Sequence, residues 1–436
     1  MAKYISFGKY NPLFKYFWYH IIAKFLNAYI LKELFRDKEL IFKNDSLPPD
    51  LLIQEGFNYL GTFIISLFLI KYEYSQVRVN DKPTESTQNI IGKNSKSIDI
   101  TLIYHKAHGD LYKCYNLIVI LLLILCELFI IIYFSLTLKG LDFWVLELFF
   151  ICYITYRMHG IQISSHKQAA ILFIFVFCSI FKILSLIFRI TEDPVERIYT
   201  DYKWIIAIGI LLFILYDLLR GYTLCKIKSI IDYQFILTTK FLAIYGLFGS
   251  CICFLLGIIP TIYSCVDQNK LNLIENICSI EDKDNNKLYY DTYKFFFELL
   301  WPKDNIFINI LYVLIFIAKI ILSFAVKFFC MQILKKLNPE YLISSNSLYY
   351  FIVDICDIIL FLIKKDGFKL FKFFGTMAEF FSFLGTIIYL ELIELHFCGL
   401  DHDLKKNITY RSASDSQMEV VEIEKDGQSE LEETFY

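Results

Sequence analysis

Four ionisable side chains lie near the middle of long apolar segments: Glu127, Lys182, Lys319 and Asp354. A charge at the centre of a bilayer costs at least about 2.5–3.5 kcal/mol on insertion scales, so such residues usually face a bundle interior or a water-filled cavity. A cavity that contains both lysines would suit an anionic solute such as a phosphate, a nucleotide or a carboxylate. Glu127 or Asp354 would then act as counter-ion or proton carrier. A buried ion pair with a structural role is the alternative.

Two further residues complete the candidate substrate site. Glu379 lies off-centre in an apolar segment, and Tyr389 offers a ring that could stack on a base. The 31 tyrosines of the chain make the choice of Tyr389 only weakly informative. Other residues of these two kinds are Glu147, Lys327 and Asp357, and Tyr312, Tyr349 and Tyr350.

The signatures of soluble enzymes are missing from the sequence. The patterns GxxxxGK[ST], HExxH and GxSxG do not occur, and the seven His residues are not clustered. Cys251 and Cys253 are two residues apart and point to different sides of a helix, so we predict no metal site there. We therefore predict that the chain is not an enzyme and takes no cofactor. For the alternative of a membrane-embedded lipid-modifying enzyme, His166 beside Lys167 is the candidate.

The elements that must position these residues are apolar segments of helical length. The chain has 436 residues and is 56% hydrophobic, against roughly 45–50% in soluble proteins. Only helices and closed barrels satisfy their backbone groups in lipid, and continuous runs of this length select helices. We predict an all-α polytopic membrane bundle of ten transmembrane helices, at residues 13–33, 51–71, 115–137, 142–158, 168–190, 204–220, 238–262, 306–330, 342–363 and 373–396.

The first apolar segment decides where the termini lie. It is diluted by Lys15, His20 and Lys24, so a surface amphipathic helix is the alternative to a span. Ten spans would place both termini on one side, and the distribution of Lys and Arg favours the cytoplasmic side. No cleavage site follows this segment, so we expect an uncleaved anchor in an endomembrane or the plasma membrane.

Polar segments separate and follow the apolar ones. We expect a disordered cytoplasmic loop at 78–98, a polar loop at 264–305 on the far side and a disordered acidic tail at 397–436. Cys265 and Cys278 share the far-side loop and could form a disulfide there. The sequon at Asn44 would also face away from the cytoplasm and could carry a glycan. The net charge of −2 gives no reason to invoke nucleic acid.

The ten segments divide into two sets of five, at 1–190 and 204–396. The third and eighth segments then correspond, as do the fifth and tenth, so Glu127 corresponds to Lys319 and Lys182 to Glu379. Inverted repeats place a substrate site at the membrane midplane between the halves. Opposite charges there could pair in the absence of substrate.

The seventh and tenth segments carry a likeness to a known family. Residues 383–393 read Phe-Leu-Gly-Thr-Ile-Ile-Tyr-Leu-Glu-Leu-Ile, which is similar to the closing helix of the drug/metabolite transporter superfamily, in the nucleotide-sugar-transporter-like branch. Residues 245–249, Tyr-Gly-Leu-Phe-Gly, precede an apolar run that ends at Pro260 and Tyr263, and resemble a Glu-Gly…Phe-Gly segment of that branch. Tyr245 stands in place of the acid and Leu390 in place of an Asn. Gly246, Gly249 and Gly385 would allow close helix packing.

The resemblance implies two inverted five-helix repeats with cytoplasmic termini and a central solute cavity. We expect a secondary transporter of a small metabolite, with an anionic nucleotide sugar, nucleotide or organic acid as the favoured class. The alternative is a non-transporting receptor or scaffold that binds partners through its loop and acidic tail. The expected partners are the lipid bilayer and a small-molecule substrate, and a homo-oligomer is left open.

Overall fold

The computed structural model describes the residues that form the helices, two short strands and some of their connections. These are residues 5–7, 14–27, 51–80, 114–136, 144–159, 163–192, 203–234, 236–262, 296–297, 301, 306–364 and 370–396. The helices are α1 (Phe14–Phe25), α3 (Leu51–Asn80), α6 (Cys114–Leu136), α7 (Trp144–His159), α8 (Ser165–Glu192), α10 (Lys203–Gln234), α11 (Thr238–Ile262), α14 (Ile306–Lys336), α15 (Pro339–Lys364) and α16 (Leu370–Tyr389). The strands are β1 (Ile5–Phe7) and β2 (Ile393–Leu395).

The predicted helical bundle is confirmed, since each of the predicted segments contains one helix. Five of these helices are long and apolar enough to cross a membrane, through Leu52–Glu73, Ser165–Phe188, Thr238–Ile258, Asn309–Lys336 and Leu370–Tyr389. Large apolar side chains such as Phe68, Leu255 and Phe307 are exposed on these helices. An exposed apolar surface of this extent is typical of contact with lipid.

Several helices depart from the predicted spans. Helix α3 continues past residue 71 to Asn80, and α14 continues past residue 330 to Lys336. Helix α1 has 12 residues, about 18 Å at 1.5 Å per residue, which is less than the roughly 30 Å of a hydrocarbon core; residues 28–33 of that span lie outside the described residues. Helix α10 continues past residue 220 to Gln234 because a buried apolar face continues through Leu224, Ile227 and Ile231. Helix α16 ends at Tyr389, where the backbone turns through Glu391 at a positive φ of 58°.

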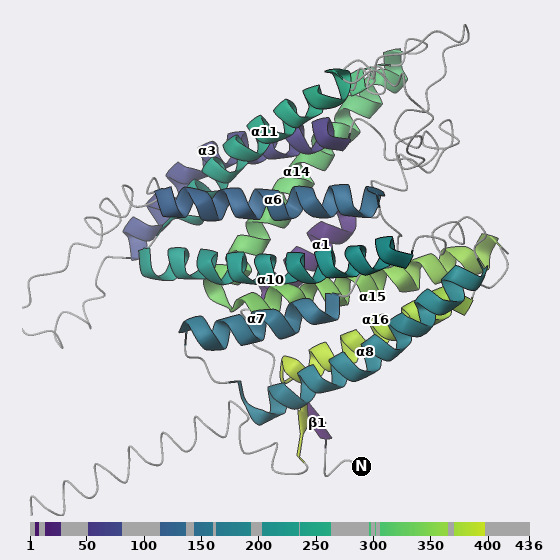
Figure 1. Cartoon of the computed structure of the whole chain (residues 1–436). Coiled ribbons are helices and arrows are strands. Elements are labelled where there is room, and N and C mark those ends of the chain that lie inside the picture. The colour runs from purple at the N-terminus through teal and green to yellow at the C-terminus, as the bar shows by residue number, and fades with distance from the viewer. Residues whose placement is uncertain are drawn as a thin grey trace, which may run out of the picture.

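The helices form three layers, and Figure 1 shows them side by side. The first layer contains α3, α6, α11 and α14; the second contains α1, α7, α10 and α15; and α8 pairs with α16 in the third. The most extensive contacts join α3 to α11 and α8 to α16. Each of these two pairs takes one helix from the first five and one from the last five.

The contacts between helices recur when the first five helices are exchanged with the last five. Under this exchange α1 corresponds to α10, α3 to α11, α6 to α14, α7 to α15 and α8 to α16. The contact of α1 with α15 recurs as α10 with α7, that of α1 with α14 as α10 with α6, that of α3 with α14 as α11 with α6, and that of α7 with α8 as α15 with α16. Contacts of α14 with α10, α11 and α15, and of α10 with α15, have no counterpart of similar extent among the described residues.

Glycines allow the closest helix contacts, as the sequence predicted. A Cβ atom on Gly246 of α11 would lie 2.6 Å from the backbone nitrogen of Phe63 and 2.7 Å from the carbonyl oxygen of Tyr59, both on α3. A Cβ on Gly385 of α16 would overlap Ile174 of α8. A side chain at Gly246 would therefore require movement of the α3 backbone, and one at Gly385 would require the Ile174 side chain to shift.

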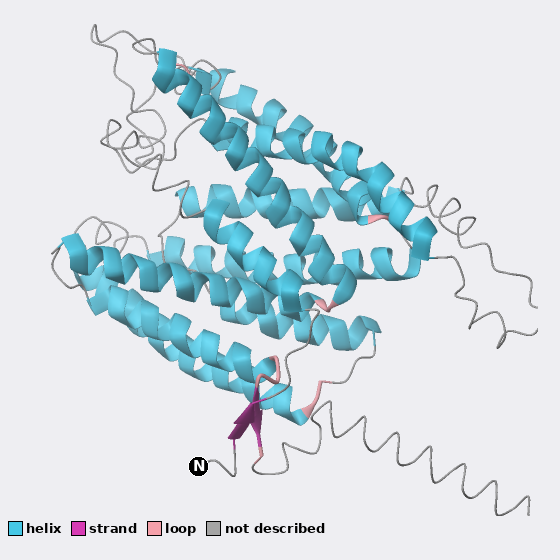
Figure 2. Cartoon of the chain, turned by 180° about the vertical axis from the view of Figure 1, so that it is seen from behind, coloured by secondary structure: helices cyan, strands magenta, loops and turns pink. Residues whose placement is uncertain are grey.

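The two strands bring distant parts of the chain together at one end of the bundle. Strand β1 pairs antiparallel with β2, and Ile5 lies opposite Leu395. Figure 2 shows this ribbon beside the ends of α8 and α16. The segment before α1 and the segment after α16 therefore lie on the same side.

Candidate functional site

A small cavity lies between α7, α8, α15 and α16. Two of these helices belong to the first five and two to the last five, and they correspond in pairs. The cavity volume of about 10 Å³ leaves room for roughly one water molecule. Its lining is mostly polar: Glu147, Lys182, Asn346, Ser347, Tyr350, Glu379 and Ser382, with Cys178, Ile343 and Ala378. The bundle is therefore closed around this site.

An ion pair crosses the wall of the cavity. The Nζ atom of Lys182 on α8 lies 2.8 Å from Oε1 of Glu379 on α16, and the side chains are only 15% and 11% exposed. The sequence predicted that these opposite charges correspond and pair without substrate, and the structure brings them together. Close by, the Cys178 thiol donates a hydrogen bond of 3.0 Å to the carbonyl of Ala378.

A second ion pair stands behind the cavity. Nη1 of Arg220 on α10 lies 3.1 Å from Oε1 of Glu147 on α7, and Glu147 is completely buried. Arg220 also lies 5.8 Å from the ring centre of Tyr216 on its own helix. The carboxylate that lines the cavity is thus held from behind by a guanidinium of the other half of the chain.

A further cation reaches the cavity from α1. Nζ of Lys24 donates a hydrogen bond of 2.7 Å to Oδ1 of Asn346. Its ammonium lies 4.5 Å and 4.8 Å from the ring centres of Tyr349 and Tyr350, a cation–π arrangement. One turn earlier, Nδ1 of His20 lies 3.0 Å from Oγ of Ser345. His20 and Lys24 therefore point into the bundle, whereas Lys15, the third polar residue that dilutes α1, is exposed.

A separate polar centre lies in the first layer, around Glu127 of α6. Its carboxylate accepts hydrogen bonds from Tyr59 of α3, at 2.7 Å, and from Tyr245 of α11. The ammonium of Lys327 on α14 lies 3.5 Å from the ring centre of Tyr59 and 5.1 Å from that of Tyr245. Tyr245 stands where the resemblance predicts an acid, and here the carboxylate comes from α6 instead.

The remaining predicted site residues lie outside the cavity lining. Nζ of Lys319 donates a hydrogen bond of 2.7 Å to Gln54 on α3, so Lys319 is neither the partner of Glu127 nor a neighbour of Lys182. Asp354 is half-buried on α15. Tyr389 is buried at the end of α16, where its hydroxyl lies 3.9 Å from the Cys152 thiol.

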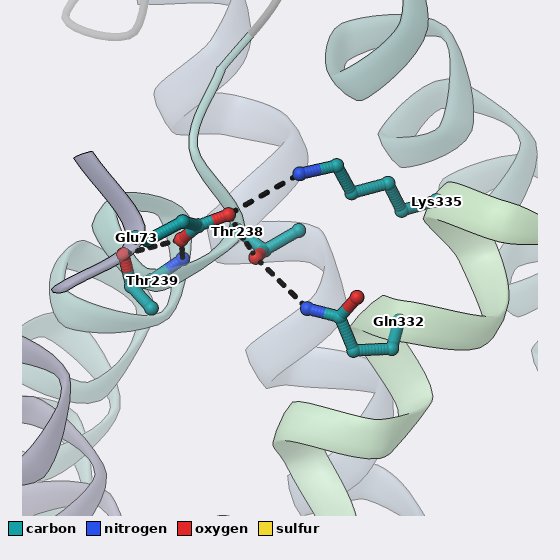
Figure 3. A network of polar contacts seen from close by, with 5 residues as sticks. All are labelled: Glu73, Thr238, Thr239, Gln332 and Lys335. Carbon is teal, nitrogen blue, oxygen red and sulfur yellow. Dashed lines mark hydrogen bonds and ion pairs between the residues drawn. The ribbon is translucent and has the colours of Figure 1, made fainter. Parts of the chain in front are cut away.

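A polar network ties the two sets of helices at the end where α3 finishes and α11 begins (Figure 3). The Glu73 carboxylate of α3 accepts hydrogen bonds from the backbone amide of Thr239, at 3.0 Å, and from the hydroxyls of Thr238 and Thr239. Lys335 of α14 forms an ion pair of 3.2 Å with the same carboxylate. Gln332 donates to the Thr238 hydroxyl at 3.3 Å. A carboxylate at a helix N-terminus also interacts favourably with the helix dipole.

The opposite end of the same layer is held by aromatic rings. Phe57 of α3 stacks on Phe296 at 5.2 Å between ring centres and meets Phe254 of α11 edge-on at 5.3 Å. Phe316 of α14 lies 5.8 Å from Phe57. The two ends of this layer are therefore closed by different chemistry, one polar and one apolar.

Other predicted features either have a structural contact or lie outside the described residues. Nε2 of His166 accepts a hydrogen bond of 3.1 Å from the backbone amide of Leu395, so this histidine anchors β2. The described residues contain no cluster of His, Cys, Asp and Glu that could hold a metal. Cys265, Cys278, Asn44, the tail 397–436 and all but the first three residues of the loop 78–98 lie outside the described residues; α3 extends through those three.

Several buried polar residues were missed from the sequence. Asp217 and Glu394 lie near the ends of predicted segments, and both are buried. Arg220 was overlooked because it sits where the apolar run of α10 ends. Its spacing of three residues from Asp217 was a usable signal, since both lie on one helical face.

Comparisons with known proteins place the chain in no family. No family model matches it, and neither does any curated protein or solved structure.

Proposed function

We propose that this chain is a secondary transporter of a small metabolite that works by alternating access. In this proposal all ten helical segments cross the membrane, and residues 1–190 and 204–396 form two inverted halves. The observation that carries the proposal is the recurrence of helix contacts between the first and last five helices. An odd number of spans in each half reverses its direction, so repeated halves would be related by an axis in the membrane plane.

The position of the cavity supports this proposal. Two corresponding helix pairs surround it, and inverted repeats place substrate at such an interface, near the midplane. In the described conformation each end of the first layer holds the halves together, through Glu73 at one end and Phe57 at the other. Alternating access requires these two ties to open in turn.

The favoured substrate is an anion, such as a nucleotide sugar, a nucleotide or an organic acid. Lys182 lines the cavity, and Lys24 and Arg220 stand directly behind Asn346 and Glu147. An entering anion would compete with Glu379 for the Lys182 ammonium. Lys319, which hydrogen-bonds to Gln54, has no part in this site. The charges around the cavity thus reduce the predicted lysine pair to one contacting lysine.

Orientation follows from the same proposal. The Glu73 end, the β1–β2 ribbon and both termini would face the cytoplasm of an endomembrane or plasma-membrane protein. The stretch from Lys71 to Lys113 carries seven Lys and Arg residues on this side, in keeping with the positive-inside rule.

Ligand-dependent thermal stabilisation of the purified full chain tests the proposal. The panel contains nucleotide sugars, nucleotides, organic acids and amino acids. A bound ligand at about 100 times its Kd adds about 2.7 kcal/mol to the free energy of unfolding. We expect one anionic class to raise Tm in the wild type and to have no effect on the charge-free pair Lys182→Met with Glu379→Gln. Equal stabilisation of that variant would remove the cavity from the mechanism. A chain truncated after residue 404 should behave as the wild type; loss of all activity with the tail would favour a scaffold.

A further inference from the structure

The Glu127 centre draws its hydrogen bonds from both halves of the chain. Tyr59, like Glu127, belongs to the first half, and Tyr245 belongs to the second. The two rings meet edge-on with centres 5.1 Å apart, and their hydroxyl oxygens are 3.4 Å apart. This half-buried carboxylate therefore has one donor that moves with it and one donor that belongs to the opposing half.

A buried cation completes the centre without a direct ion pair. The Nζ atom of Lys327 is enclosed and forms no hydrogen bond among the described residues. It packs instead on the faces of Tyr59 and Tyr245. Glu127 of α6 and Lys327 of the corresponding helix α14 thus contact the same two tyrosines. Glu127 accepts hydrogen bonds from their hydroxyls, and the Lys327 ammonium lies against their rings.

The groups that surround this centre come from helices of both halves. The Cys253 thiol lies within electrostatic reach of Glu55, Glu127 and Lys327. The Cys330 thiol lies within reach of Glu127, Arg220 and Lys24, and the Cys126 thiol within reach of Glu127, Arg220 and Glu147. The titratable and charged groups are therefore Lys24 of α1, Glu55 and Tyr59 of α3, Cys126 of α6 itself, Glu147 of α7, Arg220 of α10, Tyr245 and Cys253 of α11, and Lys327 and Cys330 of α14.

Separation of the halves changes what stabilises the negative charge. Donated hydrogen bonds and a nearby cation favour an ionised carboxylate, whereas burial without them favours the neutral acid. When the halves part, Glu127 keeps Tyr59 but loses the Tyr245 hydroxyl and the Lys327 ammonium. The carboxylate then binds a proton more readily than it does in the closed form.

We propose that Glu127 binds a proton when the halves separate and releases it when Tyr245 returns, which makes the conformational cycle proton-coupled. The inference rests on the proposed function for its two moving halves. The balance is simple: one H⁺ from the water that enters the open side adds to the carboxylate, and closure returns one H⁺ to water. Tyr59 and Tyr245 act as positioning donors and keep their own protons.

Infrared difference spectroscopy of the purified full chain, titrated with acid, tests the proton site. The wild type should gain a protonated-carboxyl band that Glu127→Gln lacks. Tyr245→Phe and Tyr59→Phe each remove one donor to a charged group, worth about 1.5–3 kcal/mol, so each should move the midpoint of that band up by about one to two pH units. If Glu127→Gln does not elute as a folded species, Glu127→Asp replaces it, and the band should change frequency. A band that survives Glu127→Gln unchanged would overturn the proposal.

A distance measurement tests whether separation of the halves depends on protonation of Glu127. It also distinguishes Tyr245 from Tyr59, because both substitutions are expected to shift the infrared midpoint in the same direction. Spin labels on α3 and α14, at Tyr72 and Lys336, report the separation of the halves. In the wild type and in Tyr59→Phe we expect this distance to change with pH. In Tyr245→Phe the change with pH should be smaller. In Glu127→Gln the distance should stay at its open value at every pH. A pH dependence that survives Glu127→Gln would overturn the coupling. Failure to find any transported ligand would instead count against the proposed function and leave these titrations standing.

Discussion

Lys24 and Arg220 occupy matching places in the two halves of the chain. Lys24 lies on α1 and reaches Asn346 of α15, while Arg220 lies on the corresponding helix α10 and reaches Glu147 of the corresponding helix α7. Each cation thus crosses to the other half and holds a residue that lines the same cavity. The charges of the two partners differ, since the partner of Lys24 is a neutral amide and the partner of Arg220 is a carboxylate.

This difference predicts unequal costs for the two truncations. Lys24→Met leaves a buried amide oxygen without its donor, which should lower the free energy of unfolding by about 1–3 kcal/mol. Arg220→Met leaves the Glu147 carboxylate buried without its cation, which should cost about 3–5 kcal/mol. Thermal unfolding of the purified variants measures both, and Glu147→Gln should rescue Arg220→Met. Equal losses for the two variants would contradict the described pairing.

The Lys182–Glu379 pair makes a similar prediction within the membrane. Lys182→Met alone should destabilise the chain by about 3–5 kcal/mol because Glu379 stays behind as a buried unpaired charge. Adding Glu379→Gln to Lys182→Met should restore most of the stability. A double-mutant cycle in detergent gives the coupling energy. Additive losses would show that the two side chains do not interact in solution.

Lysine substitutions also test which lysine of the predicted cavity, Lys182 or Lys319, contacts the ligand. Lys319→Met removes a hydrogen bond to Gln54 and should leave ligand-dependent stabilisation intact, since Lys319 does not line the cavity. The variant Lys182→Met with Glu379→Gln should lose that stabilisation. If Lys319→Met instead abolishes binding, the ligand site lies in the first layer rather than between α7, α8, α15 and α16.

The contact between α3 and α11 should not tolerate a methyl group. Gly246→Ala places its Cβ against backbone atoms of Tyr59 and Phe63, and overpacking of this kind typically costs about 1–3 kcal/mol. Gly375→Ala is the matched control, because its nearest neighbour, Oγ of Ser185, would lie 3.5 Å away. The control should stay within about 0.5 kcal/mol of the wild type. Thermal unfolding of both variants provides the comparison.

The sequence predicted the helices well because apolar runs of helical length leave few alternatives in lipid. It located α11 from residue 238 to residue 262, as the structure has it. The prediction was wrong where a polar residue in the sequence was taken to mark the end of a helix or its exposure to solvent. Helix α10 continues beyond residue 220, where Lys226, Lys228 and Asp232 interrupt the apolar run, and in α1 two of the three polar residues, His20 and Lys24, contact α15.

Partners inside the bundle were harder to predict than positions along the chain. Lys182 and Glu379 were paired correctly because they lie in corresponding segments, the fifth and the tenth, although Glu379 is off-centre in its predicted segment. Glu127 was assigned to Lys319, whereas the lysine beside its tyrosine donors is Lys327, about two turns later on the same helix. The depth of a residue along its helix does not specify on which face of the helix it lies. The residues that contact Glu127 are instead determined by how α3 and α11 pack together.

Alternating access is tested most directly by distances at the two ends of the bundle. Electron–electron resonance would use one label pair at Tyr72 and Lys336, beside the Glu73 network, and another at Leu52 and Phe307, beside the phenylalanine cluster. Glu73→Gln weakens the first tie and leaves the second intact. The account predicts that the first distance lengthens while the second stays the same or shortens. Lengthening of both distances together, or of neither, would contradict two halves that open at one end at a time.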